Sequence, residues 1–290
     1  MHIDANTRLI ALLGYPVGQT LSPFIHNTAF AAQGINFAFA AFPVPPERIE
    51  DGVRGLAALH FAGAGVTIPH KQAVLPYLDE LSPRARAVGA SNMIVRRPDG
   101  TLFGDNTDVT GFLAPLLSLT DRLQGADMAV LGAGGAARAV AYALLVTFRP
   151  KRLTLIARTP SKADMLATDL TAFDEHKALE VHAFSSARAA VRGARLVVNT
   201  TPVGMYPAVD DSPWSNADDF GDDHIVYDIV YNPEETRLLS DAASRGAVTL
   251  GGLDMLVEQA AAAYVQWTGH EMPVDVVKEA LRRRSEMLHR

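Results

Sequence analysis

The spacing of apolar residues in the first part of the chain predicts strands that alternate with helices. Short apolar stretches at Leu9 to Leu13 and at Gly65 to Ile68 are typical of buried strands, and residues 37–42 alternate with a period of two. The run from Ser22-Pro23 to Gly34 has the start and stop signals of a helix, and residues 46–59 also have a helical pattern. This alternation predicts a mostly parallel sheet.

The next residues indicate a hairpin and then a second strand and helix series. Residues 93–97 and 101–103 flank Pro98-Asp99-Gly100, whose Asp-Gly pair is a hairpin turn signal. After a helical stretch at 110–119, the second series is expected to have strands at Met128 to Leu131, Leu153 to Ala157, Leu196 to Asn199 and Ile225 to Val230. From Gly252 the pattern is helical only, at Leu253 to Trp267 and Val274 to Leu288.

Two sheets therefore follow from the pattern, with a boundary near Asp108. The length of 290 residues agrees with this, because a single hydrophobic core stops growing at roughly 250 residues. We predict an α/β protein of two domains. Residues 1–107 form the first domain, and residues 108–251 form the second.

Composition excludes several classes of protein. The net charge of −6 leaves no basic field for a nucleic acid, and the lack of cysteine excludes disulfides and thiol catalysis. The start of the chain has no secretory signal pattern and no apolar run reaches the ~18 residues of a membrane span, so a cytoplasmic protein without membrane contact is expected. The nine histidines follow no metal-binding pattern, and His26 and His60 are expected to be surface residues or hydrogen-bonded core residues.

A glycine-rich turn after the strand at Met128 predicts a nucleotide site in the second domain. The turn reads Gly132-Ala133-Gly134-Gly135-Ala136-Ala137 and leads into a helix-forming run that reaches Val146. Glycines let the backbone approach a pyrophosphate, and the N–H groups and dipole of the helix favour its negative charge. The alternative is a turn that only links a strand to a helix.

The end of the next predicted strand indicates which dinucleotide binds. An acidic residue here would accept hydrogen bonds from a ribose 2′-hydroxyl, but the sequence offers Arg158, Thr159 and Lys162 and no carboxylate. A guanidinium can hold a 2′-phosphate with two hydrogen bonds, so NADP is favoured over NAD. The alternative is that Arg158 and Lys162 only face solvent.

Two motifs offer the groups that hydride transfer from an alcohol needs, namely an acid/base and a group that holds it. Lys71 ends the motif Val66-Thr67-Ile68-Pro69-His70-Lys71, just past a predicted strand. Asp108 ends Gly104-Asp105-Asn106-Thr107-Asp108 at the domain boundary. We expect the Lys71 ammonium group and the Asp108 carboxylate to meet. The alternative is an exposed lysine and an aspartate that caps the following helix.

Two hydroxyls at the start of the first helix form a candidate carboxylate pocket. Thr20 and Ser22 lie where hydroxyl groups and helix N–H groups can together bind a negative charge. The alternative for Ser22 is a simple helix cap.

These motifs, in this order, resemble the shikimate dehydrogenase family from about Leu9 to Gln266. The family strings G-x-P-x-x-H-S-x-S-P, V-T-x-P-x-K and G-D-N-T-D correspond to residues 14–23, 66–71 and 104–108, and the turn at Gly132 also matches. The late strings N-x-T-x-x-G-M and G-x-x-M-L-x-x-Q correspond to residues 199–205 and 252–259.

The resemblance implies an NADP-dependent oxidoreductase that acts on a ring hydroxyl of a small cyclic hydroxy-carboxylate such as shikimate. It implies that residues 252–290 complete the first domain, which binds substrate, and that the second domain is Rossmann-type. Lys71 and Asp108 would be the catalytic pair, and Thr20 and Ser22 would hold the carboxylate. The ring hydroxyls would contact Thr67, Asn92, Tyr231 and Gln259. The cofactor would contact Gly132, Ala133, Gly134, Gly135, Ala136, Arg158, Thr159, Lys162, Thr200 and Gly252.

Some positions differ from the family pattern. Gln19-Thr20 replaces His-Ser, Ser91-Asn92-Met93 replaces Val-Asn-Thr, and Ala157 replaces an Asn. Because a site that hydrogen-bonds a hydroxyl discriminates strongly between ligands, quinate or another cyclic hydroxy acid stays open as the substrate. A folate-linked dehydrogenase and a non-catalytic NADP-binding sensor are the further alternatives. The protein is expected to be a monomer or a homodimer.

Overall fold

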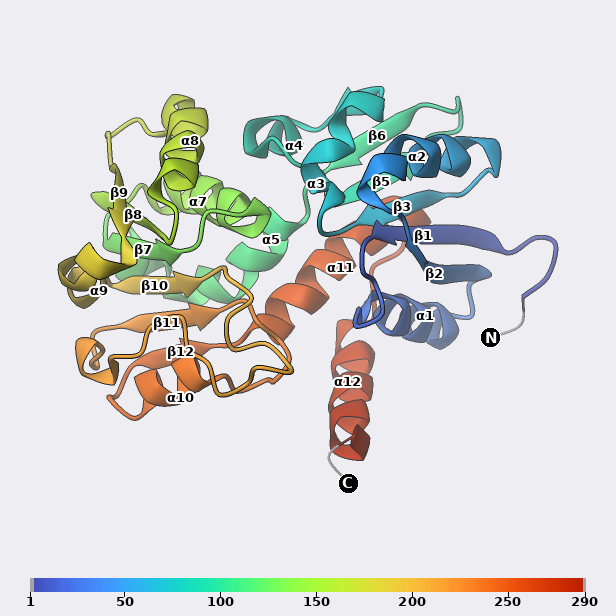
Figure 1. The fold of residues 1–290 in the computed structure, drawn as a ribbon. Coiled ribbons are helices and arrows are strands. Elements are labelled where there is room, and N and C mark those ends of the chain that lie inside the picture. The colour runs from blue at the N-terminus through green and yellow to red at the C-terminus, as the bar shows by residue number, and fades with distance from the viewer. Residues whose placement is uncertain (1–2, 289–290) are drawn as a thin grey trace. The chain divides into compact units, whose positions relative to one another are not determined.

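The computed structural model describes residues 3–288, with the side chains of residues 3–284. The chain divides into two compact units, Met1–Gly111 with Val257–Arg290, and Phe112–Leu256 (Figure 1). Among the described residues the strands form two six-stranded sheets, one in each unit. The predicted α/β class is confirmed.

The sheet of the first unit is mixed, and its strands run in the order β2-β1-β3-β5-β6-β4. Their bounds are β1 Arg8–Gly14, β2 Phe37–Pro43, β3 Gly63–Val66, β4 Glu80–Leu81, β5 Met93–Arg96 and β6 Leu102–Asp105. β1, β2 and β3 are parallel, as is the β4–β6 pair, whereas β5 is antiparallel to β3 and β6. The antiparallel pair β5–β6 is the predicted hairpin. Its second strand leads directly into residues 104–108.

Helices cover both faces of this sheet. They are α1 Ser22–Gln33, α2 Ile49–Ala58, α3 His70–Ala73, α4 Pro83–Val88, α11 Gly252–Thr268 and α12 Val274–Leu288, and α5 Asp108–Leu113 begins in this unit. The short 3₁₀ turns are η1 Pro46–Arg48 and η2 Leu75–Tyr77. Helix α1 ends because Gly34 adopts a left-handed conformation and donates its N–H to the helix carbonyls.

Alternating residues of β1 pack into a buried cluster on one face of the first sheet. Ala11 and Leu13 belong to a cluster that includes residues of α2, such as Val53 and Leu56. On α1 and α11, aromatic rings pack together, and the indole N–H of Trp267 donates to the carbonyl of Ile94 in β5 at 2.9 Å. Helix α12 contacts α1 (Figure 1). Most of α11 and all of α12 therefore belong to the first unit.

The sheet of the second unit is fully parallel, in the order β12-β11-β10-β7-β8-β9. The strands are β7 Asp127–Leu131, β8 Arg152–Ala157, β9 Leu179–Ala183, β10 Leu196–Asn199, β11 Ile225–Asp228 and β12 Val248–Leu250. Counted from β7, this is the strand order of a Rossmann fold, in which the order reverses between β7 and β10. Ligands of such sheets bind at the carboxyl ends of the strands at that point.

Helices of the second unit pack on both faces of its sheet (Figure 1). Their bounds are α6 Thr120–Leu123, α7 Gly135–Phe148, α8 Pro160–Leu170, α9 Arg188–Gly193 and α10 Arg237–Ala243, with 3₁₀ turns η3 Ala114–Leu119, η4 Thr171–Phe173, η5 Phe184–Ser186 and η6 Ala217–Asp219. Ala129 and Leu131 of β7 share one buried cluster with Val191 of α9 and Leu238 of α10. Ala129 and Leu131 are two residues apart, as expected for side chains on the same face of a strand.

Two local predictions are wrong, and three strands were missed. The strand predicted at Gly65 to Ile68 runs from Gly63 to Val66, because a turn closed by the hydrogen bond from His70 N–H to the Thr67 carbonyl follows it. The strands β4, β9 and β12 were not predicted, because they are short or carry polar residues such as Glu180 and His182. Ser22 is the first residue of α1, and its N-cap position belongs to Leu21, so Ser22 does not cap this helix.

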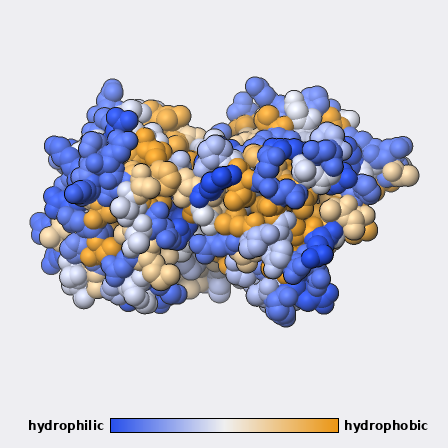
Figure 2. Space-filling view, turned by 90° about the horizontal axis from the view of Figure 1, so that it is seen from above, coloured by the Kyte–Doolittle hydropathy of each residue, from blue (hydrophilic) through white to orange (hydrophobic). Residues whose placement is uncertain are grey.

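On the face shown in Figure 2, hydrophobic residues lie in patches between hydrophilic ones, which is ordinary for a folded protein surface. Within residues 3–288, no helix combines the length and the apolar character that crossing a membrane requires. The same residues contain no group of three or more histidine or acidic side chains that could hold a metal ion.

Candidate active site

The structure brings Lys71 and Asp108 into direct contact within the first unit. Lys71 lies in α3, and Asp108 is the first residue of α5. The Lys71 Nζ donates to Asp108 Oδ2 at 2.6 Å, and the two side chains are 20% and 9% exposed. The pair is mostly shielded from water, so its attraction is stronger than that of an exposed ion pair.

The backbone before Lys71 is fixed by hydrogen bonds to three neighbouring segments. Thr67 N–H donates to the carbonyl of Leu13, and Ser91 N–H donates to the carbonyl of Lys71 itself. The ring of His70 is buried, and its Nε2 lies 2.7 Å from the carbonyl oxygen of Val44. Thr67 is half-buried and lies four residues before Lys71. These hydrogen bonds therefore hold the backbone at Lys71 in a fixed position.

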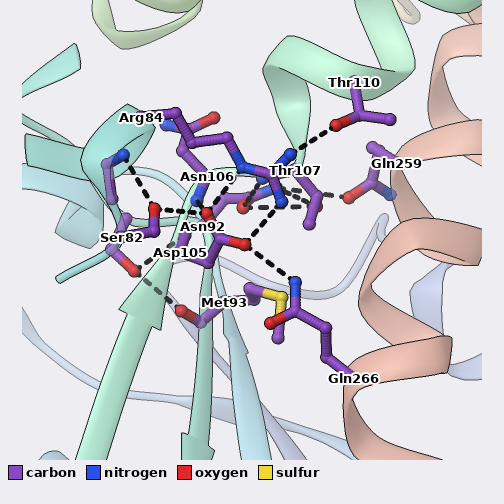
Figure 3. A network of polar contacts seen from close by, with 12 residues as sticks. Ser82, Arg84, Asn92, Met93, Asp105, Asn106, Thr107, Thr110, Gln259 and Gln266 are labelled. Carbon is purple, nitrogen blue, oxygen red and sulfur yellow. Dashed lines mark hydrogen bonds and ion pairs between the residues drawn. The ribbon is translucent and has the colours of Figure 1, made fainter. Parts of the chain in front are cut away.

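Asn92 holds the second oxygen of Asp108. Its Nδ2 donates to Asp108 Oδ1 at 2.9 Å and to Thr107 Oγ1 at 3.0 Å, and it lies 3.3 Å from Gln259 Oε1 of α11 (Figure 3). Its Oδ1 accepts the N–H of Thr107 at 2.7 Å. Asn92, Asp108 and Gln259 thus form one polar cluster, although Asn92 and Gln259 are 167 positions apart in the sequence.

The other aspartate of the 104–108 motif serves a different purpose. Asp105 is buried and accepts hydrogen bonds from Ser82, Arg84 and Gln266 (Figure 3). Burial acts to raise the pKa of Asp105, but the hydrogen bonds from Arg84, Ser82 and Gln266 outweigh it and hold the pKa below the usual value. Sequence reasoning did not find these three partners, although Ser82-Pro83 is a helix-start signal and Ser82 does cap α4.

Thr20 and Ser22 lie together at the start of α1. Thr20 Oγ1 is 3.2 Å from Ser22 Oγ and accepts the N–H of Ser22 at 3.3 Å. Both residues are half-buried. Because Ser22 does not cap α1, its hydroxyl is available for an anionic ligand beside that of Thr20.

Two of the departures from the family pattern are internal. Met93 is fully buried in β5. The Ser91 hydroxyl is also buried, and it donates to the carbonyls of Met93 at 2.7 Å and Asp105 at 3.0 Å. Neither side chain therefore offers an exposed polar group to a ligand.

The second unit has a cavity of about 590 Å³ at the carboxyl ends of its strands. Seven of the predicted cofactor residues line it, namely Gly132, Ala133, Gly134, Arg158, Thr159, Lys162 and Thr200. Ala157, Phe184, Thr201, Pro202, Val203, Ser212 and Pro213 complete the lining and were not predicted as cofactor residues. Phe184 follows β9, so recognition of the alternation at Leu179, Val181 and Ala183 could have revealed it.

Gly132 shows why the turn at this cavity needs glycine. Its φ is +118°, and a Cβ there would lie 2.5 Å from Thr200 Oγ1. Thr200 in turn donates its hydroxyl to the carbonyl of Leu131 at 2.7 Å. The ends of β7 and β10 therefore meet at the point where the strand order reverses.

The remaining predicted cofactor residues lie outside the lining of this cavity. Gly135 and Ala136 begin α7, and Gly252 begins α11. A Cβ on Gly252 would lie 2.3 Å from the carbonyl oxygen of Ile229, so the packing of the backbone already requires a glycine there.

Tyr231 lies in the second unit, three residues after β11, and burial raises the pKa of its hydroxyl. The segment before it is held by Asp228, which accepts hydrogen bonds from Asn199, Thr236 and the N–H of Val230. Burial raises the pKa of Asp228, and these hydrogen bonds act in the opposite direction. The Asn199 of the 199–205 motif is therefore a structural residue that links β10 to β11.

Comparisons with known proteins find family models and relatives that match this chain. Residues 12–94 match a family model described as the shikimate dehydrogenase substrate binding domain, and residues 252–282 match one described as the shikimate 5′-dehydrogenase C-terminal domain. A curated protein of Salinibacter ruber (strain DSM 13855 / M31), named shikimate dehydrogenase (NADP(+)), is 59% identical over 97% of this chain and 99% of its own.

Solved structures are similar over nearly the whole chain. A shikimate dehydrogenase in complex with NADP+ has a TM-score of 0.91 and 37% identity, and covers 98% of this chain and 97% of its own. A quinate dehydrogenase from Corynebacterium glutamicum in complex with NAD has a TM-score of 0.87 and 31% identity, and covers 96% and 99%.

Proposed function

This chain belongs to the shikimate dehydrogenase family, and on that premise we propose that it reversibly oxidises one ring hydroxyl of shikimate with NADP as the oxidant. The observation that carries the proposal is the 2.6 Å contact between Lys71 and Asp108. An acid/base is the one group that this chain must supply itself, because the cofactor takes up the hydride.

The reaction removes a hydride and a proton from a secondary alcohol and leaves a ketone. NADP+, when bound, supplies the hydride acceptor. Lys71, in its neutral form, takes the hydroxyl proton, and in the reverse direction its ammonium group returns that proton to the ketone oxygen. Asp108 holds the Lys71 Nζ and polarises the substrate hydroxyl, while Asn92 fixes the second carboxylate oxygen.

The residues around the cavity of the second unit fit NADP. Gly132, Ala133 and Gly134 would accommodate the pyrophosphate, and Arg158 and Lys162 would bind the 2′-phosphate together with Thr159. None of the residues that line this cavity, all of them described, is acidic. A site for NAD would place a carboxylate there to accept hydrogen bonds from the ribose.

We expect Arg158→Met to raise the KM for NADP about 10- to 30-fold and to leave the KM for NAD nearly unchanged. The reason is the loss of a charge-assisted hydrogen bond of about 1.5–2 kcal/mol that only the 2′-phosphate can accept. Initial rates with both cofactors measure this. Arg237→Met removes another exposed arginine of the same unit and serves as the control. Equal losses with both cofactors would contradict the assignment.

The substrate is proposed to be a small cyclic hydroxy-carboxylate. Thr20 and Ser22 would bind the carboxylate, and Thr67, Asn92, Tyr231 and Gln259 would contact the ring hydroxyls. Shikimate is favoured over quinate because the relative with 59% identity carries the shikimate name. We propose a cytoplasmic enzyme, a monomer or a homodimer, without a nucleic-acid partner.

Steady-state kinetics test this proposal directly. With NADP, we expect kcat/KM for shikimate to exceed that for quinate by at least about tenfold, since a mismatched hydroxyl is strongly rejected. A preference for quinate would contradict shikimate as the substrate but would agree with the proposed oxidation of a ring hydroxyl. No turnover with shikimate, quinate or related hydroxy acids, despite NADP binding, would instead favour a non-catalytic sensor.

A further inference from the structure

Asp105, three residues before Asp108, carries a buried negative charge that no step of the proposed reaction uses. Its side chain is 5% exposed. Among the described residues, the donors to it are Ser82 Oγ at 2.5 Å, Arg84 Nε at 2.6 Å, Arg84 Nη2 at 2.5 Å, Asn106 N at 2.7 Å and Gln266 Nε2 at 2.8 Å. A carboxylate with this many donors is fixed in one orientation.

Arg84 links both sides of Asp108. Two of its guanidinium nitrogens bind Asp105, and the third, Nη1, donates to Thr110 Oγ1 at 2.8 Å (Figure 3). Thr110 lies in α5, two residues after Asp108. Because a guanidinium is planar and rigid, it fixes residues 105 and 110 relative to one another, and with them the segment between.

Helix α11 supports the same segment directly through Gln266 and indirectly through Gln259 and Asn92. Gln259 and Gln266 are seven residues apart, so they lie about two turns apart on one face of the helix. Gln259 lies in hydrogen-bond distance of Asn92, and Gln266 donates to Asp105 (Figure 3). Residues 105–110 are therefore held by α4, by α11 and by Asn92, which directly precedes β5.

We propose that Arg84 and Asp105 are positioning residues for the Lys71–Asp108 pair, an inference that rests on the proposed function of that pair. Stability alone is a poor reason for such a network, because well-packed apolar residues often replace a buried ion pair without loss. Precise placement is a better reason, because a shift of about 1 Å in a reacting group can lower a rate by up to about 10²-fold.

Three single variants of the full-length protein test this inference. We expect Arg84→Met to lower kcat with shikimate about tenfold, to leave the KM for NADP within about twofold, and to shift the pH dependence of kcat. Arg84→Lys keeps the charge but loses the two-pronged contact, so it should recover only part of kcat. Thr110→Ala removes one hydrogen bond and should have a smaller effect in the same direction.

Arg97→Met is the matched control. Arg97 also lies in the first unit and also forms an ion pair, with Glu80 at 2.8 Å, but it has no contact with residues 104–110 among its described interactions. We expect its kcat and pH dependence to stay within about twofold of those of the wild type, since exposed ion pairs contribute little.

A double variant separates positioning from simple stabilisation. In Arg84→Met the Asp105 charge is left buried without its main partner, which lowers Tm, and adding Asp105→Asn removes that charge. Recovery of Tm with a still reduced kcat and a shifted pH profile supports positioning. Recovery of kcat together with Tm overturns it.

Wild-type activity distinguishes the two levels of the hypothesis. An inactive wild type contradicts the proposed function. An active wild type with a normal Arg84→Met kcat and pH profile overturns only the positioning role. Should Arg84→Met fail to fold, Arg84→Lys and Thr110→Ala decide the question, and wild-type kinetics in both overturn the role.

Discussion

Replacing Lys71 with methionine is expected to lower kcat about 10²- to 10⁴-fold, because the reaction then lacks its acid/base. The methionine side chain is unbranched and one atom shorter than that of lysine, and it has no proton-exchanging group. Asp108 is left buried without its cation, yet Asn92 still binds its other oxygen. The binding of NADP should stay within about twofold, since every residue that lines the nucleotide cavity belongs to the other unit.

Lys71→Arg distinguishes acid/base catalysis from a purely electrostatic role. Arginine keeps the positive charge beside Asp108, but its pKa is too high for it to exchange a proton near neutral pH. We therefore expect Lys71→Arg to be nearly as slow as Lys71→Met. Substantial activity in the arginine variant would indicate that the positive charge matters and the proton does not.

Lys151→Met is the control for both variants. Lys151 is exposed and lies in the second unit, in the turn before β8. Its replacement should leave kcat and both KM values unchanged. Near-wild-type turnover of Lys71→Met, measured under the same conditions as this control, would remove Lys71 from the mechanism.

In the second sheet the sequence predicted the four inner strands and missed the two edge strands, for a physical reason. Strands β7, β8, β10 and β11 are buried on both faces of a parallel sheet and appear as short apolar runs. The edge strand β9 has a half-exposed pattern with polar residues, so its apolar run is interrupted. The strands that were missed, β4, β9 and β12, all lie at sheet edges, whereas the edge strand β2 was found because its residues alternate clearly.

The candidate site shows a similar division. Lys71 was expected just past a strand end and Asp108 at the domain boundary, where the two side chains would meet, and they do meet. Arg84 and Gln266 were not found, because they lie on helices whose other residues determine the apolar pattern. Their roles depend on a contact with Asp105 over distances of 21 and 161 residues, which no local pattern encodes.

His26 shows that the position of a polar residue in a helix does not suffice to predict its surroundings. The sequence led us to expect a surface residue or a hydrogen-bonded core residue. The structure places it in the core, 3% exposed, where its ring stacks on Phe39 at 4.5 Å. Its Nδ1 has no hydrogen-bond partner among the described residues. Burial therefore lowers the pKa of His26 to about 3, from an ordinary value of 6.5.

This shift makes folding depend on pH through one residue. Between pH 6.5 and about 3 the unfolded chain binds a proton at His26 that the folded chain does not bind, so stability falls as pH falls through this range. The contribution is fully present above the unfolded value. From about pH 7 to about pH 4.5 the free energy of unfolding should lose about 2.5 kcal/mol from His26 alone.

His26→Phe and His26→Leu should remove this dependence, because neither side chain can bind a proton. Urea unfolding at about pH 7 and about pH 4.5 gives the loss of unfolding free energy for each protein. The loss should be smaller than in the wild type by about 2.5 kcal/mol in both variants. Carboxylates such as Asp105 contribute equally to all these proteins, so the difference isolates His26. The control is His270→Leu, because His270 is exposed, and this variant should lose as much unfolding free energy as the wild type. An equal loss in the wild type and in both His26 variants would show that His26 is protonated as easily in the folded chain as in the unfolded one.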